Sequence, residues 1–184
     1  MWYVYVIIGA VALLLILWIV GFYNGARVKE NNIENAFAQL DAQFKRRYDL
    51  IPNMVNTVKG YAAHEQETLA KIIALRNAGA AASTDEDKIA AAEQMSGVAK
   101  TFGLLVEQYP QLKADVSFNR LMEELAATEN KIASFRQFYN DAILIFNRAV
   151  VKFPNAILAG LFRFKKKRYL ETAAEQRENV EVKF

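Results

Sequence analysis

The residue whose type comes closest to offering catalysis is the single histidine, His64, which is followed directly by Glu65. An imidazole beside a carboxylate can act as a general acid or base when a nucleophile or substrate-binding groups are placed near it. The chain has no cysteine, and its sequence places no serine as a nucleophile for this pair. We therefore interpret His64 as a surface or capping residue and predict no catalytic residues.

Metal and cofactor sites are also disfavoured by the composition. The absence of cysteine excludes thiolate zinc sites and disulfides, and one histidine is too few for most multi-histidine sites. Two-metal carboxylate sites in helical bundles need a Glu-x-x-His motif on each of two helices. There is also no glycine-rich phosphate loop. The sequence therefore predicts no metal, no cofactor and no enzymatic activity.

Three consecutive basic residues, Lys45, Arg46 and Arg47, raise the question of a nucleic-acid site. Successive residues of a helix point ~100° apart, so these three cannot form one patch, and we expect them to be solvated or salt-bridged. The net charge of +3 is likewise local, because residues 163–168 (RFKKKR) alone carry five positive charges. The rest of the chain is slightly acidic, which does not favour a nucleic-acid partner.

A second polar group lies in the expected last long helix, over 117–153. It is denser than a plain helix of a bundle needs, and it comprises Arg136, Asn140, Asp141 and Asn147. We hypothesise that these side chains pair with residues 46–49 in an internal network that fixes the register of two helices.

Residues 1–26 are predicted to form a membrane anchor. The chain from Trp2 to Tyr23 contains no charged residue. At ~1.5 Å per residue, a helix of this length spans ~33 Å, about the thickness of a bilayer's hydrocarbon core. Trp2 and Tyr3 lie at one end and Trp18 and Tyr23 near the other, as expected for the two membrane interfaces. A cleaved signal peptide would start with basic residues and have a shorter apolar run, so we favour a single transmembrane helix.

The orientation of this anchor follows from its flanking charges. Arg27 and Lys29 follow the apolar segment at once, whereas no lysine or arginine precedes it. Positively charged flanks stay on the cytoplasmic side. The sequence therefore predicts a short N-terminus outside and the following domain in the cytoplasm.

Residues 27–154 are predicted to form a helical bundle, because apolar residues recur every three to four positions. Stripes of this kind cover 33–73, 92–109 and 118–153, and the last two end at Pro110 and Pro154. Short loops between long amphipathic helices indicate antiparallel neighbours around one core. The predicted fold is all-α: an N-terminal transmembrane helix followed by a long-helix antiparallel bundle of the four-helix type.

Pro52 lies within the first stripe without shifting its phase. Inside a helix, proline deletes one backbone hydrogen bond and clashes with the preceding turn. One outcome is a bend in a single long helix, which gives a bundle of three helices. The other is a sharp turn, with Asp49 capping a new helix and Pro52 in its first turn, which gives four. The sequence leaves both open.

Residues 155–184 are predicted to form a basic amphipathic tail, in which an apolar segment precedes four consecutive cations. This combination suits an anionic membrane surface, to which each charge contributes ~1 kcal/mol. Alternatively, the apolar segment caps the bundle and the lysines face water. Residues 179–184 alternate apolar and polar side chains, which fits a small pairing strand or a frayed end. The residues predicted to contact the membrane are Trp2, Tyr3, Trp18, Tyr23, Phe162, Phe164, Lys165, Lys166, Lys167 and Arg168.

The stretch FKRRYDLIPNMV at 44–55, with VKGY at 58–61, resembles the LemA family. Further matching motifs are HE at 64–65, EQYP at 107–110, LKA at 112–114, TENKI at 128–132, YND at 139–141 and FP at 153–154. The resemblance implies a bacterial membrane protein with an N-terminal span and a bundle of four-helix type. It implies no reaction, and relatives are associated with membrane-linked roles, including those at bacterial organelle membranes.

Together these features predict a non-enzymatic scaffold in the bacterial inner membrane, with a single-pass anchor and a cytoplasmic bundle. We expect it to contact the lipid bilayer, to form homo-oligomers and to organise membrane or partner proteins. The alternative is an adaptor or sensor that recruits an envelope enzyme, such as a membrane protease.

Overall fold

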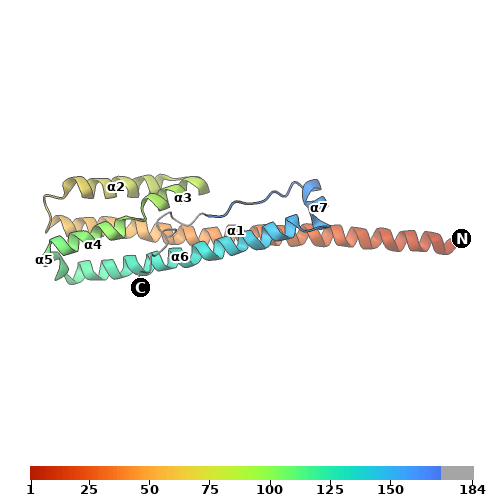
Figure 1. Ribbon diagram of the computed structural model, residues 1–184, viewed down its shortest axis with the longest axis horizontal. Coiled ribbons are helices and arrows are strands. Elements are labelled where there is room, and N and C mark those ends of the chain that lie inside the picture. The colour runs from red at the N-terminus through yellow and green to blue at the C-terminus, as the bar shows by residue number, and fades with distance from the viewer. Residues whose placement is uncertain (171–184) are drawn as a thin grey trace, which may run out of the picture. The chain divides into compact units, whose positions relative to one another are not determined.

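The computed structural model describes residues 1–170, and every regular element in that range is a helix (Figure 1). This confirms the predicted all-α fold with a long apolar helix at its start. The helices are α1 (Trp2–Lys59), α2 (Gln66–Ala81), α3 (Asp85–Gln94), α4 (Val98–Gln108), α5 (Pro110–Lys113), α6 (Val116–Val151) and α7 (Asn155–Leu161). The predicted strand or frayed end at 179–184 lies outside the described residues.

Helix α1 continues through Pro52 to Lys59, so the proline is not the site of a turn. Proline lacks the N–H that would bond to the carbonyl of Tyr48, one turn earlier. The side chain of Arg76 on α2 supplies a donor instead, because its Nε bonds to the Tyr48 carbonyl oxygen at 3.1 Å. The carbonyl that loses its usual donor to proline thus receives a hydrogen bond from a neighbouring helix, which allows the long helix to continue.

The turn occurs later, at residues 60–65, where the apolar stripe predicted continued helix. The backbone bonds Gly60 N to Thr57 O and Glu65 N to Ala62 O close this turn. Ala62 is 1% exposed within it. Because its methyl group still faces the core, the apolar spacing stays in phase across a turn, and periodicity alone could not detect the change of direction.

The stripe over 92–109 is also divided, here into α3 and α4. Thr84 caps the start of α3, since its Oγ1 accepts a hydrogen bond from Asp87 N at 3.1 Å. At the other end, Ser96 Oγ donates to the Glu93 carbonyl at 2.7 Å, and Gly97 follows. Serine bonded to the backbone and glycine both disfavour continued helix, so the chain turns once before α4.

The chain divides into two compact units, and each is described by itself. One contains residues 39–135 and holds the bundle core. Polar contacts join α1 to α2 through Arg76, to α3 through Lys88 and to α6 through Arg47, and α2 lies beside α3 (Figure 1). Its fully buried side chains include Leu40, Ile51, Met54, Val58, Met95, Phe102, Leu112 and Phe118.

The other unit contains residues 1–38 and the chain from Arg136 through the end of the described residues. In it α1 packs on α6, with Phe37 and Tyr139 as a ring pair whose centroids lie 5.7 Å apart. Helix α7 leaves α6 at a bend of 97°. The core of this unit comprises Ile33, Ile143, Phe146, Val150 and Ala159.

Two asparagines of α6 hold the extended segment that follows α7. Asn147 exchanges two hydrogen bonds with the backbone of Lys167, both 2.9 Å, and Asn140 exchanges two with Leu170, at 3.1 and 2.8 Å. Seven helical residues rise ~10.5 Å and three extended residues span ~10 Å, so the two spacings match. The predicted pairing of these asparagines with residues 46–49 is therefore wrong.

Candidate functional site: a basic and aromatic cluster beside the apolar start of α1

The start of α1 is apolar and fully exposed. An 18-residue window of this helix has a mean hydropathy of 2.8, and none of it is buried within the chain. Trp2 and Tyr3 are 77% and 57% exposed, and Leu14 is 65% exposed. Leucine is normally withdrawn from water, so this surface needs an apolar environment. By length and composition, the helix can cross a membrane.

An aromatic cluster lies where this apolar segment ends. Tyr23 of α1 contacts Phe162 and Phe164, with ring centroids 5.1 and 5.9 Å apart. Phe164 also lies 6.1 Å from Phe22 and 6.2 Å from Phe146, both edge-on. Such pairs contribute ~0.5–1.5 kcal/mol each beyond area burial. The predicted membrane-contact residues Tyr23, Phe162 and Phe164 are thus brought together, and all three are half-buried.

Arg27 is held over this cluster by four contacts. Its Nε donates to the Tyr23 hydroxyl at 3.2 Å, and its Nη1 pairs with Glu30 at 2.8 Å. Its guanidinium carbon lies 5.3 Å from the Tyr23 ring centroid and 5.1 Å from that of Phe164. The hydrogen bonds that Arg27 donates to Tyr23 and then to Glu30 raise the pKa of Arg27 above its ordinary value. The cation is therefore fixed in place, yet its side chain remains 52% exposed.

Glu30 connects this arginine to the extended C-terminal segment. Its carboxylate receives Lys167 Nζ at 2.9 Å as well as Arg27, and its side chain is 18% exposed. The hydrogen bond from Lys167, and secondarily that from Arg27, lowers the pKa of Glu30 below its ordinary value. One carboxylate thus orders two cations.

A half-open cavity of about 270 Å³ lies over this arrangement. Four of its lining side chains are cationic and one is a carboxylate, so the cavity is strongly positive. Lys166 and Arg168 are exposed but do not line it. The lining residues are Arg27, Glu30, Phe162, Arg163, Phe164, Lys165 and Lys167.

Arg163 enters the cavity from a strained backbone position. Its φ is 60°, in the left-handed region, and Phe164 N bonds to Ala159 O at 2.9 Å. This is the hydrogen bond of a helix C-terminal motif whose left-handed position glycine normally fills. A side chain there costs ~1–2 kcal/mol. The chain accepts this strain at a residue that places a cation on the cavity wall.

Sequence reasoning missed Arg27 and Glu30 as members of this site. The signal was present, since Tyr23, Arg27 and Glu30 are spaced at i, i+4 and i+7 and so share one helix face. What the sequence could not give was the return of Lys167 to that face, which depends on Asn147 holding the extended segment. Trp2 and Tyr3 lie at the far end of the apolar run, and Trp18 is half-buried.

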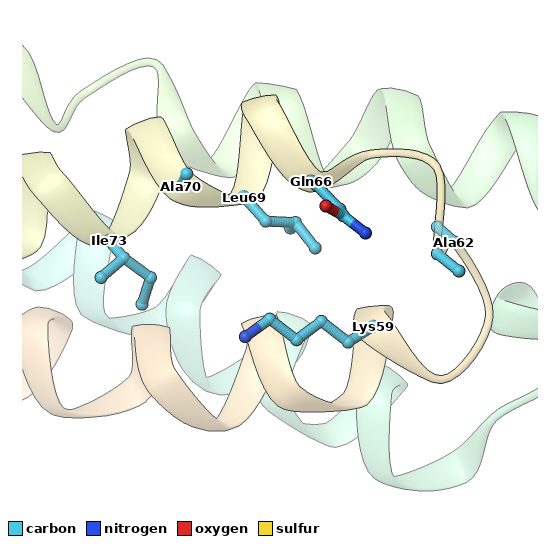
Figure 2. A pocket seen from close by; sticks show the side chains of 7 residues that line it. Lys59, Ala62, Gln66, Leu69, Ala70 and Ile73 are labelled. Atoms are coloured by element: carbon cyan, nitrogen blue, oxygen red, sulfur yellow. The ribbon is translucent and has the colours of Figure 1, made fainter.

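A second cavity, of about 450 Å³, lies between the end of α1 and the start of α2 (Figure 2). Lys59 borders it on α1, while Leu69 and Ile73 form an apolar wall on α2, with Gln66 near the turn. Within residues 1–170, Lys59 makes no ion pair. This half-open cavity offers one cation beside an apolar surface.

The remaining charged residues that the sequence singled out stabilise the fold or lie on its surface. Arg46 lies 3.8 Å from Glu124, and Arg47 is ion-paired to Glu129 at 3.2 Å, so the expectation of salt-bridged arginines is confirmed. Its burial was not anticipated, since Arg47 is only 2% exposed. His64 is exposed in the turn before α2. Among the described residues no group of histidine, aspartate and glutamate is placed to hold a metal ion.

The described geometry defines a class of protein: a helical bundle whose first helix begins with a segment long and apolar enough to cross a membrane. A basic and aromatic cluster borders the end of that segment.

The chain belongs to the LemA family, because residues 36–184 match the model of that family. It is 31% identical over 137 residues to "Protein LemA" of Metamycoplasma hominis, an alignment that covers 73% of this chain and 62% of that protein. It is 25% identical over 176 residues to "Magnetosome protein MamQ" of Magnetospirillum gryphiswaldense, covering 82% and 62%. It is 23% identical over 175 residues to "Magnetosome protein MamQ 2" of Paramagnetospirillum magneticum, covering 81% and 64%. The chain thus spans less than two thirds of the length of these relatives.

Proposed function

We propose that this chain is a non-enzymatic scaffold of the LemA type, anchored by a single span in the bacterial cytoplasmic membrane with its bundle in the cytoplasm. The observation that carries the proposal is the charge-free start of α1, where every residue from Met1 to Leu17 is exposed, on all faces of the helix. A helix that is apolar on every face needs lipid or protein around it.

The flank of this segment supports the orientation. Arg27, Lys165 and Lys167 gather around one cavity beside its C-terminal end. Cations at one end of a span favour the cytoplasmic side, where the leaflet is anionic. Helix α7 adds an apolar face, since Ile157 and Leu161 are 64% and 70% exposed. These features suit a segment that lies against the membrane surface.

Membrane anchoring is tested by fractionating cells that express the full chain and washing the membranes at alkaline pH. The proposal predicts that the chain remains in the washed membranes. The control is a variant in which Leu13 and Leu14 are both replaced by arginine, since each charge at the centre of a span costs ~2.5–3.5 kcal/mol or more. Release of the unaltered chain by the wash would contradict the anchor.

Self-association is part of the proposed scaffold role, and two of the relatives are named as magnetosome proteins. The test is the mass of the full chain in lipid nanodiscs across a range of protein-to-lipid ratios. A scaffold that assembles gives multiples of the 20.8 kDa chain. A strict monomer at every ratio would contradict assembly.

An adaptor that recruits a membrane protease or another envelope enzyme is the second candidate. The cavity between Lys59 and the apolar wall of α2 favours it, because a cation beside an apolar groove suits an acidic and apolar peptide. Copurification of one stoichiometric partner that is lost in Lys59→Glu would support the adaptor. Homo-oligomers with no partner would support the scaffold.

A further inference from the structure

The cavity bordered by Arg27 and the extended segment has features that general attraction to a membrane does not require. Diffuse attraction needs only cations near the surface, on mobile side chains. Here Arg27 is fixed by Tyr23 and Glu30, and Lys167 is fixed by the same carboxylate. Positioned cations around a half-open cavity are the arrangement of a binding site.

The charge of the cavity calls for an anion. Four cations face one carboxylate, and within residues 1–170 neither Arg163 nor Lys165 is paired with an acidic side chain. Like charges gathered in this way repel each other. An anion with several oxygens relieves the repulsion, and arginine and lysine both bind phosphate oxygens through charge-assisted hydrogen bonds.

The position of the cavity along the membrane normal indicates where the anion comes from. Arg27 follows Tyr23 by one helical turn, which places it ~6 Å beyond the apolar segment along the helix axis. The headgroup layer of a bilayer extends ~5–8 Å beyond the hydrocarbon on each side. The cations therefore lie at the depth of lipid phosphates.

The aromatic side chains on the cavity wall point to the same class of ligand. Phe162 and Phe164 line the cavity together with the cations. A free phosphate ion gains nothing from a phenyl ring, whereas the glycerol and first acyl carbons of a lipid do. The volume of about 270 Å³ corresponds to that of ~9 water molecules in the liquid, which is room for a headgroup rather than a whole lipid.

We propose that the cavity formed by Arg27, Arg163, Lys165 and Lys167 binds the phosphate headgroup of one anionic glycerophospholipid per chain. Glu30 acts as a positioning residue, because it holds two of the cations and does not itself bind the anion. The inference rests on the proposed membrane anchoring and deepens it, since it adds a discrete, saturable lipid site to the span.

The test uses the full chain in neutral detergent, titrated with short-chain phosphatidylglycerol, short-chain phosphatidylcholine and inorganic phosphate. Bound lipid is counted by native mass spectrometry, and stabilisation is followed as the shift in Tm. We expect one phosphatidylglycerol per chain with a saturable rise in Tm, and at least ~10-fold weaker effects of the other two probes. Equal effects of phosphatidylcholine or of inorganic phosphate would overturn the assignment.

Matched charge variants separate the cavity from the surrounding charge. Arg163→Gln with Lys165→Gln removes two cations that line it, whereas Lys166→Gln with Arg168→Gln removes two from the same segment that do not. The first pair should weaken phosphatidylglycerol binding at least ~10-fold, and the second by less than ~2-fold. Equal losses in the two pairs would show that the attraction is diffuse and would overturn the site.

Arg163→Gly is a control that separates a loss of lipid affinity from a loss of folding stability. Glycine removes the strain of the left-handed position along with the cation. The Tm of the free chain should therefore rise while the affinity for phosphatidylglycerol falls. A rise in Tm with unchanged affinity would contradict a role for this residue. Membrane retention after alkaline washing tests the anchor separately, so the two proposals can fail independently.

Discussion

Each unit of the chain contains an ion-paired arginine, but one is buried and the other is half exposed. Arg47, in the unit of residues 39–135, bonds to Glu129 and to the Ala92 carbonyl at 2.8 Å, and it is 2% exposed. Arg27, in the other unit, is also ion-paired and lies over aromatic rings, but its side chain is half exposed and borders a cavity.

The difference lies in what remains available once the contacts are made. A guanidinium has five N–H donors. Those of Arg47 face protein on every side, and its Nε has no acceptor within the described residues. Within the described residues Arg27 bonds to side chains through Nε and Nη1 alone, and its side chain is 52% exposed, so its other donors remain accessible. A buried cation that is fully enclosed fixes helix packing, whereas a fixed cation with open donors can bind an anion.

Replacing each arginine by methionine is the most direct way to break this comparison. Methionine keeps the apolar stem but leaves Glu129 and the Ala92 carbonyl without their donor in the Arg47 variant. We expect Arg47→Met to lower the free energy of unfolding by ~2–4 kcal/mol. Arg27→Met should lower it far less, because an exposed ion pair contributes little to stability. Urea titration in detergent, followed by helical circular dichroism, measures both, and equal losses would contradict the comparison.

The second prediction concerns the packing around Tyr48, the residue after Arg47. We expect no room there for an added methyl group. A Cβ at Gly79 of α2 would meet the ring of Tyr48 more closely than real Cβ atoms approach other atoms. Overpacking costs ~1–3 kcal/mol and the gain in helix propensity is ~1 kcal/mol, so Gly79→Ala should destabilise by up to ~2 kcal/mol. Gly103 of α4 has open space around it, and Gly103→Ala should be neutral or stabilising. Thermal unfolding measures both variants: Gly79→Ala should lower the Tm, whereas Gly103→Ala should leave it unchanged or raise it.

The third prediction concerns the arginine that compensates for Pro52. Arg76→Met leaves the Tyr48 carbonyl without a donor, which should cost ~1–2 kcal/mol. Pro52→Ala restores a backbone N–H one turn after that carbonyl, so the same Arg76 substitution should cost less in its presence. A double-mutant cycle measures this coupling. Additive effects would show that the two residues do not share the acceptor.

The smallest expected effect is the pH dependence of the open arginine site. The pKa of Glu30 is lowered, first by Lys167 and then by Arg27. A lowered folded-state pKa contributes stability above the unfolded pKa, and this stability is lost as the pH falls through the folded value. The Tm advantage of the unaltered chain over Glu30→Gln should therefore be present near pH 7 and disappear once the pH has fallen through the lowered pKa of Glu30. An advantage that grows with acidity would have the wrong sign.

Much of the fold was predictable because its signals are local. The charge-free run from Trp2 to Tyr23 and the stripes that follow are read directly from residue spacing, as is the Thr84 cap. Residue spacing does not fix the course of the chain at Pro52, because that course depends on Arg76, which lies on another helix. The turn at 60–65 was missed because Ala62 keeps the apolar phase through it.

Only part of the candidate site could be predicted, because only some of its residues carry a local sequence signal. Its aromatic and lysine residues stood out as a basic apolar tail, and Tyr23 as an interfacial residue. The partners Arg27 and Glu30 were missed, because only the fold returns Lys167 to α1. Asn140 and Asn147 stand out in the sequence as polar residues of a long helix, but periodicity does not reveal that their partner is an extended backbone.

The central proposal is that the start of α1 crosses the membrane and leaves the bundle in the cytoplasm. The chain has no cysteine, so Ser83→Cys in the exposed link between α2 and α3 provides a single thiol. A membrane-impermeant maleimide applied to spheroplasts should label this thiol only after the membrane is permeabilised. Full labelling of intact spheroplasts would contradict the account.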